Sequence, residues 1–521
     1  MAPQFEIKNE VLSSDEKVFP LTQTQKQSLK QIGDSKRVVV IFIKWKYHVL
    51  TNLENLQKPE DAALIGFFAE QTRAKLPECV VKHFDEIFWF KADYSCFESL
   101  FTDLKLLNIP ELDSFLSQAI HLIPRAKLRL IESEEWVNTT LFHFRKKYQI
   151  PGPSYDDLEP LRNKALEKMV GEAEGVPSAK FALLDFKNMF NINTEVDRIK
   201  HLIGTFPMFR KPVHRAGCGG CARINDEKEL LEWIRETLDE EYDGLYLIEE
   251  CVFGMEFSAA VCLLADGTWR PMYISYNGEK TVVDALKSGD PLPFHGERFE
   301  DSLEMFPNMD KFVDQVIKAY KPPFPHLLCV QGFQLERNTD KYYLTEITYG
   351  MVGQHDTMLS YMYSGVSQET ALLSCHLNPK YQAEPDPNRP KIFERHIWYP
   401  YSEGLLCSHL GIVENSPISS ELTFNWLIEP GTKLCKPTSF AHFLVHIRLR
   451  NENKKRVLED LEWLGKNWRP DVVPIEEMVE KNVGSLSMCF QETNFGDFEE
   501  AEDPELNIFN ASQRSLVRVS T

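Results

Sequence analysis

The sequence predicts an α/β fold whose N-terminal part contains a parallel sheet, and three observations lead to this prediction. Residues 37–43, RVVVIFI, are almost entirely apolar, which is typical of a strand buried on both faces. Similar strand-like runs occur at 84–90 and 126–132, and helical spacing separates them. Strands that alternate with helices along a chain indicate βαβ units.

The composition argues against several classes of protein. The chain has 521 residues with 58 Lys and Arg against 78 Asp and Glu, a formal net charge of −20. No excess of cations is present to displace counterions from nucleic acid or to bind anionic lipid, so neither partner is expected. No apolar run approaches the roughly 20 residues that span a bilayer. The first residues carry charges where a signal peptide is apolar, and the 11 cysteines are scattered, so we expect a reduced, cytoplasmic protein.

Two further predictions concern the N-terminal part: the positions of its helices, and whether it binds a dinucleotide. The apolar spacing predicts helices within 60–76 and 95–120. A dinucleotide-binding Rossmann fold has a glycine-rich turn directly after its first strand. Here KWKYH at 44–48 follows the first strand, which argues against a dinucleotide site.

A glycine-dense loop follows a predicted strand near the middle of the chain. Residues 214–221 read HRAGCGGC. Because glycine lacks a Cβ, backbone N–H groups there can approach an anion closely, and neighbouring cations can add charge. A plain hairpin turn explains the loop equally well, and its C-x-x-C pair leaves zinc or redox chemistry open. The candidate anion-binding residues are Lys211, Arg215, Gly217, Cys218, Gly219 and Gly220.

A second candidate segment is LIEECVFGMEF at 247–257. A strand here ends in two carboxylates, Glu249 and Glu250, and the chain bends at a glycine before it reaches Glu256. Such a bend can hold a flat base against the backbone of Cys251 and Val252, while Glu256 accepts from ribose hydroxyls. A solvated acidic turn is the alternative interpretation.

A third candidate is Glu346, at the end of the strand KYYLTEI. This strand and LLCVQGFQLE at 327–336 flank an RNTD turn, so the two are predicted to form a hairpin. A carboxylate at such a strand end suits a hard cation such as Mg²⁺.

Taken in order, these segments resemble the ATP-grasp superfamily over about 85–375. The resemblance lies in IPGPSYDDLEPLRNK (150–164), GVPSAKFALL (175–184), RKPVHRAGCGGCARI (210–224) and LIEECVFGMEFS (247–258). It is greatest for carboxylate–amine ligases of the group that includes carnosine synthase and bacterial amino-acid ligases. A weaker likeness to the small C-terminal unit of that group covers 404–447.

The resemblance implies an ATP-grasp fold with an N-terminal βαβ domain, and it implies roles for single residues. Lys164 and Lys211 would bind the phosphates of ATP, and Glu249 would lie near the adenine amino group. The backbone of Glu250, Cys251 and Val252 would contact the base, Glu256 would hold the ribose, and Glu346 would bind Mg²⁺. In such enzymes a carboxylate is phosphorylated and an amine then displaces the phosphate, so Arg215 and Glu346 are the candidate catalytic residues.

The sequence departs from the family pattern at the metal site. The first strand of the family's hairpin carries an acidic ligand, and the matching position here is Gly332. The family's Asn two residues after the second ligand is Thr348, and the Arg often found two residues further is Gly350. Mg²⁺ binding is therefore in question, with Gln334 and Thr348 as substitute ligands.

The domain organisation follows from these segments. We expect a polar extension (1–36), an N-terminal α/β domain (37–150), an ATP-grasp domain (151–377) with a lid over about 178–258, a C-terminal α+β unit (378–480) and an acidic, disordered tail (481–521).

Two functions remain open at this stage. The first is an ATP-dependent ligase that joins a small carboxylate to an amine, with amino-acid-like substrates. The second is a nucleotide-binding pseudoenzyme that acts as a regulator or scaffold, which the altered metal site favours. The sequence does not fix the oligomeric state, and a homodimer is compatible with it.

Overall fold

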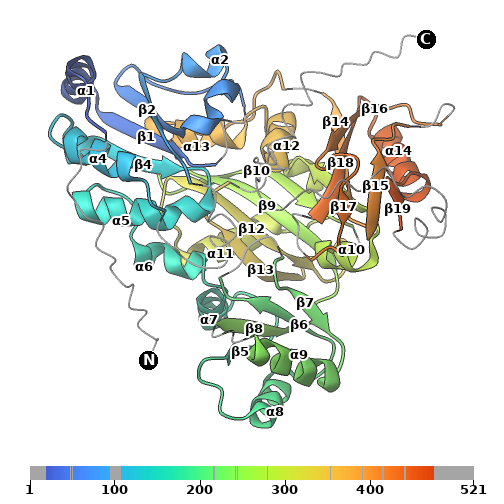
Figure 1. The fold of residues 1–521 in the computed structure, drawn as a ribbon. Coiled ribbons are helices and arrows are strands. Elements are labelled where there is room, and N and C mark those ends of the chain that lie inside the picture. Colours follow the sequence, from blue (N-terminus) through green and yellow to red (C-terminus); the bar gives the residue numbers. More distant parts are fainter. Residues whose placement is uncertain are drawn as a thin grey trace, which may run out of the picture.

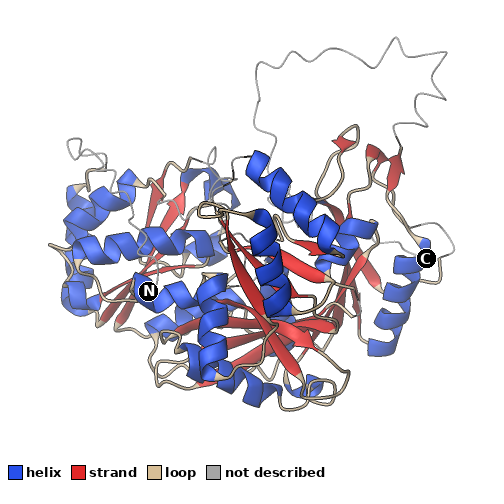
Figure 2. Ribbon diagram, turned by 90° about the horizontal axis from the view of Figure 1, so that it is seen from below, coloured by secondary structure: helices blue, strands red, loops and turns tan. Residues whose placement is uncertain are grey.

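The computed structural model describes residues 19–46, 49, 51–93, 107–214, 218–240, 242, 244–278, 280–351, 354–389, 391–412, 416–438 and 442–474. Their strands form four sheets, and Figure 1 shows these as an N-terminal sheet, a large central sheet, a small sheet below it and a C-terminal sheet. Helices pack on both sides of the strands (Figure 2). Among these residues no helix is long and apolar enough to span a bilayer.

The N-terminal sheet is parallel, with strand order β3-β2-β1-β4. The predictions of a buried first strand and of strands near 84–90 and 126–132 are confirmed. The helix predicted over 60–76 is wrong, because a fully buried strand and a 3-10 helix, Glu70–Lys75, occupy this segment. The strands are β1 (Val38–Lys44), β2 (Ala62–Ala69), β3 (Glu86–Phe90) and β4 (Leu128–Glu132).

Helices cover both faces of this sheet. One face packs on α1 (Gln23–Ser35), α4 (Pro110–Ala119) and α5 (Asn138–Tyr148), which together bury a large apolar cluster. The helix expected within 95–120 is thus observed as α4, while 94–106 lie outside the described residues. The other face packs on α13 (Gln368–Leu377), which also contacts the large sheet. A short helix, α2 (Glu78–Val81), precedes β3.

The large sheet has eight strands in the order β13-β12-β9-β10-β11-β14-β18-β16 and is antiparallel throughout. One face packs on α7 (Lys164–Glu174) and α11 (Met309–Tyr320), and the other on α12 (Gln354–Ser364) and α13. The predicted hairpin is confirmed as β12 (His326–Gln334) and β13 (Tyr342–Thr348). The remaining central elements are α6 (Tyr155–Leu158), β9 (Met255–Leu263), β10 (Trp269–Tyr276), α10 (Val282–Ser288) and β11 (Leu292–Glu297).

The small sheet, with order β5-β8-β6-β7, has its own apolar core beneath two helices. This unit is called the lid sheet below, and it lies under the edge of the large sheet in Figure 1. Its elements are β5 (Phe181–Asp185), α8 (Ile192–Ile203), β6 (Met208–Pro212), β7 (Ala222–Ile224), α9 (Glu227–Asp239) and β8 (Leu245–Glu250).

The C-terminal strands extend the large sheet. Three of them, β14 (Phe393–Pro400), β16 (Glu421–Trp426) and β18 (Phe443–Asn451), add to it and are covered by α14 (Lys454–Asn467). A separate three-stranded sheet contains β15 (Gly404–Ser408), β17 (Lys433–Leu434) and β19 (Asp471–Val473). The predicted acidic tail lies outside the described residues.

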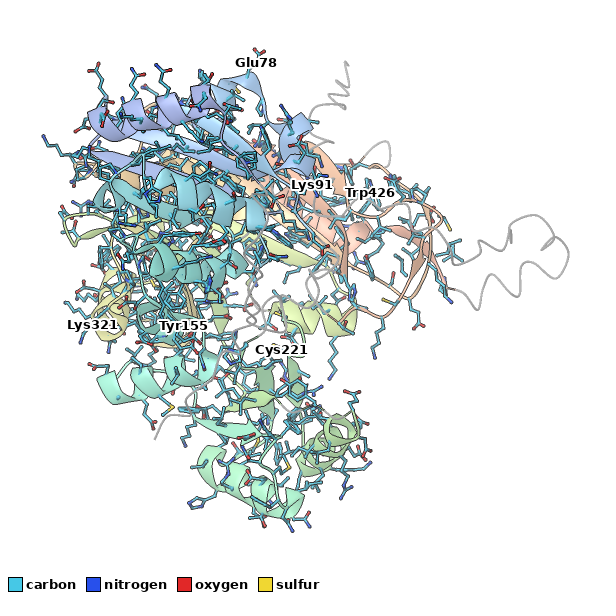
Figure 3. All side chains as sticks on the ribbon, turned by 60° about the vertical axis from the view of Figure 1, so that its left-hand side comes forward. Glu78, Lys91, Tyr155, Cys221, Lys321 and Trp426 are labelled. Atoms are coloured by element: carbon cyan, nitrogen blue, oxygen red, sulfur yellow. The ribbon has the colours of Figure 1, made fainter. Side chains whose placement is uncertain are left out.

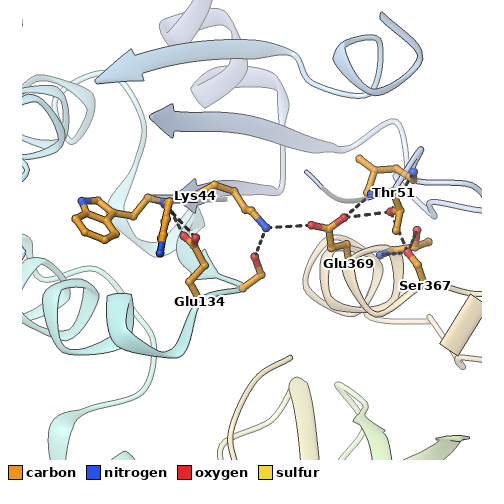
Figure 4. Close-up of polar contacts among 10 residues, drawn as sticks. Lys44, Thr51, Glu134, Ser367 and Glu369 are labelled. Atoms are coloured by element: carbon orange, nitrogen blue, oxygen red, sulfur yellow. Dashed lines mark hydrogen bonds and ion pairs between the residues drawn. The ribbon is translucent and has the colours of Figure 1, made fainter. Parts of the chain in front are cut away.

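A buried ion pair joins the N-terminal sheet to α13 (Figure 4). Lys44, at the carboxyl end of β1, contacts Glu369 at 3.1 Å, and neither side chain is more than 1% exposed. Glu369 also accepts from the Thr51 N–H at 3.0 Å, while Glu134 accepts from the backbone N–H groups of Trp45 and Lys46. The protein's own side chains therefore fill the carboxyl end of β1, where a Rossmann fold would bind its ligand.

We expect Lys44→Met to lower the free energy of unfolding by about 3–5 kcal/mol, because the buried Glu369 carboxylate would lose the ammonium that offsets its charge. Adding Glu369→Gln should recover most of this loss, since the amide oxygen still accepts from the Thr51 N–H. Urea unfolding of both variants measures the effect. A double variant no more stable than Lys44→Met would contradict this account.

Candidate functional site

The candidate site forms where α7 runs beside β13, the edge strand of the large sheet. Asn163 caps α7 by accepting from the N–H groups of Ala165 and Leu166, which fixes the position of Lys164 in the first turn. The Nζ of Lys164 lies 2.8 Å from Oε1 of Glu346 on β13. Burial alone would lower the pKa of Lys164, but the Glu346 carboxylate outweighs it and raises that pKa. The structure thus pairs the predicted phosphate lysine with the predicted metal ligand.

Side chains and the Pro177 carbonyl, which accepts from the Leu344 N–H at 2.8 Å, satisfy the outer edge of β13 over residues 344–347. Glu167 accepts from the Ile347 N–H at 3.3 Å, and the ammonium of Lys168 donates to the Leu344 carbonyl at 3.4 Å. From the lid sheet, Lys211 donates to the Thr345 carbonyl at 3.2 Å. Unpaired strand edges expose N–H and C=O groups that need partners, and charged side chains supply them here.

Glu249 of β8 lies between two lysines. Its carboxylate is 2.5 Å from the Nζ of Lys168 and 2.8 Å from the Nζ of Lys211, and all three side chains are buried. Burial would raise the pKa of Glu249, but the two ammonium groups hold it below its usual value. The same carboxylate raises the pKa of Lys211 against the effect of burial. We call Lys168, Glu249 and Lys211 the bridge, because they connect α7 with two strands of the lid sheet.

Glu249 makes contacts that differ from its predicted role, and the site contains two residues that the sequence analysis did not name. Glu249 was expected near an adenine amino group, whereas its carboxylate binds two ammonium groups. Sequence reasoning missed Glu167 and Lys168, although their spacing of three and four residues from Lys164 places them on one side of a helix. Burial, followed by the Glu346 carboxylate, raises the pKa of Glu167 to about 8.

The glycine-dense loop lies at the boundary between the lid sheet and the rest of the molecule, as the label of Cys221 shows in Figure 3. Burial raises the pKa of Cys221 to about 11, while the charges of Lys211 and Lys164 act to lower it. Cys218 has a φ of 60° and Gly220 a φ of 77°, and the Cys221 N–H donates to the Cys218 carbonyl at 3.0 Å. Two loop candidates, Arg215 and Gly217, lie outside the described residues, and Gly219 lies within this turn.

The cysteines of the C-x-x-C pair are free thiols. In the described part of the chain, no group of three or more His, Cys, Asp or Glu side chains is placed to hold a metal ion. Burial also raises the pKa of Cys218 well above its ordinary value. Protonated, buried thiols disfavour zinc binding and redox exchange, which both need a thiolate.

The bend between β8 and β9 contains the predicted base-binding residues. Glu250 accepts from the Lys180 N–H at 3.0 Å, and the Cys251 N–H donates to the Pro207 carbonyl at 3.2 Å. No described residue accepts from the Val252 N–H. The lid strand β7 covers this bend, because Arg223 lies 5.5 Å from the ring of Phe253 and contacts Asp284 of α10 at 2.8 Å.

Glu256 lies at the start of β9, on the face of the sheet opposite to the core residue Phe257. Its carboxylate accepts from Nδ2 of Asn277 at 2.8 Å. Burial raises the pKa of Glu256, and the bond from Asn277 acts against that shift.

The register of the hairpin shows which residues of β12 face Glu346. Glu346 pairs with Gln331, and a β-bulge follows between Gln331 and Gly332. Gly332 instead pairs with Leu344, and a Cβ at this position would lie 2.3 Å from the Tyr343 carbonyl oxygen. Gln331, and not Gly332, is therefore the residue directly opposite Glu346.

The substitute ligand Gln334 is also wrong. Its side chain is buried and donates to the carbonyls of Met305 and Thr339 at 2.6 and 2.8 Å, at the far end of the hairpin. Thr348 lies two residues from Glu346 on the same face of β13, so it stays a candidate. The hairpin itself thus offers one amide and one hydroxyl oxygen beside Glu346, and the Glu346 charge also acts on the carboxyl groups of Glu135 and Glu167. Oxygen donors of this kind suit a Mg²⁺ ion that is bound mainly by water and phosphate.

Comparisons with known proteins identify the fold. No protein-family model and no curated protein matches the sequence. Among solved structures, an L-amino acid ligase from Bacillus licheniformis matches with a TM-score of 0.56 and 14% identity, over 84% of this chain and 99% of that one. A carboxyaminoimidazole ribonucleotide synthase from Aspergillus clavatus, complexed with ATP, matches with a TM-score of 0.54 and 15% identity, over 84% and 100%. A biotin carboxylase from Campylobacter jejuni, in an ATP complex, matches with a TM-score of 0.52 and 13% identity, over 81% and 89%. The chain therefore has the ATP-grasp fold, as the sequence predicted.

We expect Glu249→Gln to lower the free energy of unfolding by about 3–5 kcal/mol, because two buried lysines would lose their shared counter-charge. The matched control is Glu250→Gln, which retains an acceptor for the Lys180 N–H and should cost under about 1 kcal/mol. Urea unfolding of the two variants measures the difference. Equal stability of both variants would show that the bridge does not hold the lid sheet.

Proposed function

We propose that this protein is an ATP-dependent ligase that joins a small carboxylate to an amine, with amino-acid-like substrates. The observation that carries the proposal is the convergence of Lys164, Lys211 and Glu346 at the boundary between the lid sheet and the large sheet. These residues come from three separate elements, and in the ATP-grasp fold this boundary is where a nucleotide would lie. The likeness to an L-amino acid ligase supports the substrate class.

In the proposed complex, Lys164 and Lys211 bind the phosphates. Lys164 would leave Glu346 for a phosphate oxygen, while Glu249 keeps the Lys211 ammonium oriented from behind. Fixed cations that are already in place stabilise the charge that builds up during phosphoryl transfer without a reorganisation cost. The glycine-dense loop, with Arg215, would close over the phosphates.

The base and ribose would occupy the bend between β8 and β9. The Val252 N–H has no partner among the described residues, so it could donate to a ring nitrogen of adenine. Glu256, oriented by Asn277, would accept from the ribose hydroxyls. Arg223 and Phe253 cover the outer side of the bend, and the contact of Arg223 with Asp284 of α10 keeps the lid sheet near the large sheet.

The reaction would proceed in two balanced steps. An oxygen of the substrate carboxylate attacks the γ-phosphorus and ADP leaves, which gives an acyl phosphate. The amine nitrogen then attacks the acyl carbon, inorganic phosphate leaves, and the amine loses a proton. Mg²⁺, held by Glu346 together with Gln331 and Thr348, would neutralise phosphate charge.

We expect Lys211→Ala to weaken ATP binding by about 1–3 kcal/mol, the range for a charge-assisted hydrogen bond. The matched control is Lys228→Ala on α9 of the same lid unit, whose side chain is exposed and should leave ATP affinity unchanged. Calorimetric titration with ATP measures both. An unchanged affinity in Lys211→Ala would remove the phosphate role of this lysine.

Turnover tests the ligase itself. We expect the wild type to release ADP in the presence of Mg²⁺ and a suitable pair from a panel of amino acids and small carboxylates. Glu346→Gln should reduce this rate by at least about a hundredfold, because the carboxylate nearest the phosphates is lost. No ADP release across the panel, combined with Mg²⁺-independent ATP binding, would instead support a pseudoenzyme.

A further inference from the structure

A hollow in the surface is lined by residues of which none is assigned to the nucleotide. It has a volume of about 510 Å³ and lies between α11, the turn of the β12–β13 hairpin and the segment that connects α7 to the lid sheet. We infer that this hollow binds a short peptide with a free ammonium group and a free carboxylate, and that the bound peptide acts on the lid sheet through that segment. Only the identification of such a peptide with the enzyme's product rests on the proposed function.

An open strand edge forms one wall of the hollow. The Leu344 N–H of β13 points outward and donates to the Pro177 carbonyl at 2.8 Å. Outward and inward groups alternate along an antiparallel edge strand, so the N–H and C=O of Tyr342 also point outward. No described residue forms a hydrogen bond with either group, although Tyr342 is only 3% exposed. A peptide group is a partner that satisfies such a donor and acceptor together.

Two side chains of opposite charge line the hollow without an ionic partner of their own. Lys311 of α11 is exposed and forms no ion pair with a described residue. Asp340 accepts from the neutral amide of Asn308 at 3.0 Å and has no cationic partner in the described part of the chain. Lys341 is different, because its ammonium contacts Glu336 at 2.6 Å. The hollow therefore offers one cation and one anion, which matches the two ends of a zwitterionic peptide.

Apolar side chains complete the wall. Pro177, Phe312 and Leu335 also line the hollow, and they favour a peptide with an apolar side chain. The volume lies within the range of about 300–1,000 Å³ that is typical of small-molecule sites. A dipeptide meets these requirements of size and charge, and it is the class of product that the proposed ligase would make from two amino acids.

The hollow also touches the first connection into the lid sheet. This connection runs from Gly175, the C-cap of α7 with a φ of 72°, to Phe181, the first residue of β5. The Gly175 carbonyl accepts from the Gln315 amide at 3.0 Å, and Gln315 and Pro177 both line the hollow. A bound peptide would contact the segment that has to bend when the lid sheet rotates, so peptide binding and lid position are coupled.

Calorimetric titration of the full chain with L-alanyl-L-phenylalanine, in the presence of ADP, tests the inference. We expect Lys311→Ala to weaken dipeptide binding by about fivefold or more, the loss of one hydrogen bond to a charged group, and to leave ADP affinity unchanged. Asp340→Asn should act in the same direction, because an amide does not attract the ammonium of the dipeptide. N-acetyl-L-alanyl-L-phenylalanine amide, which lacks both charges, should bind the wild type more weakly than the dipeptide. The matched control is Lys318→Ala on the same helix, whose ammonium pairs with Asp314 outside this hollow and which should change neither affinity.

Hydrogen exchange adds a readout at the lid connection. We expect the dipeptide to slow amide exchange over residues 175–181 in the wild type and not in Lys311→Ala. No dipeptide binding, or equal binding by the wild type, Lys311→Ala and Asp340→Asn, would overturn the inference and leave the nucleotide site untouched. Binding that depends on Lys311 but does not slow this exchange would overturn the coupling to the lid. Lys311-dependent binding in a protein that never releases ADP would support the peptide site and remove the ligase.

Discussion

The position of the lid sheet depends on the carboxylate of Glu249, which lies between the ammonium groups of Lys168 and Lys211. Removing three charges from water is costly, and the mutual attraction of the charges offsets this cost only if all three stay in place. The two lysines also donate to carbonyls of β13, so one set of contacts connects α7, the lid sheet and the large sheet. A ligand site at this junction is therefore built on contacts that the fold itself requires.

The boundary between the lid sheet and the large sheet is polar, and this bears on how the lid sheet can rotate. The lid sheet buries its own apolar cluster beneath α8 and α9, and the large sheet buries another beneath α7 and α11. Among the described residues, polar contacts connect the two units, including the bridge and the pair of Arg223 with Asp284. A rotation of the lid would expose little apolar surface, which is the condition for hinge closure over a ligand.

The sequence predicted most of the architecture, because buried strands and amphipathic helices have different periods. The strand Val38–Lys44 and the hairpin at 326–348 were predicted correctly. The segment Ala62–Ala69 was not, because a parallel strand that is buried on both faces has no alternation to distinguish it from a buried helix. The pairing of Gln331 with Glu346 could not be predicted either, since a β-bulge displaces the register by one residue and leaves no mark in the sequence. Lys168 could have been found from its helical spacing, but its partner Glu249 lies 81 residues further along the chain.

A bound ligand would affect the bridge and the Lys164–Glu346 ion pair differently. In the bridge the Glu249 side chain is only 6% exposed, so separating it from either lysine would leave a buried charge without a partner. In the pair of Lys164 with Glu346 the carboxylate is 34% exposed, and water can solvate it when the ammonium leaves. A nucleotide would therefore displace the outer pair at low cost while the inner bridge stays intact. The same six ionisable side chains, Lys164, Glu167, Lys168, Lys211, Glu249 and Glu346, would then keep the lid in place and still offer one cation to a phosphate and one carboxylate to a metal ion.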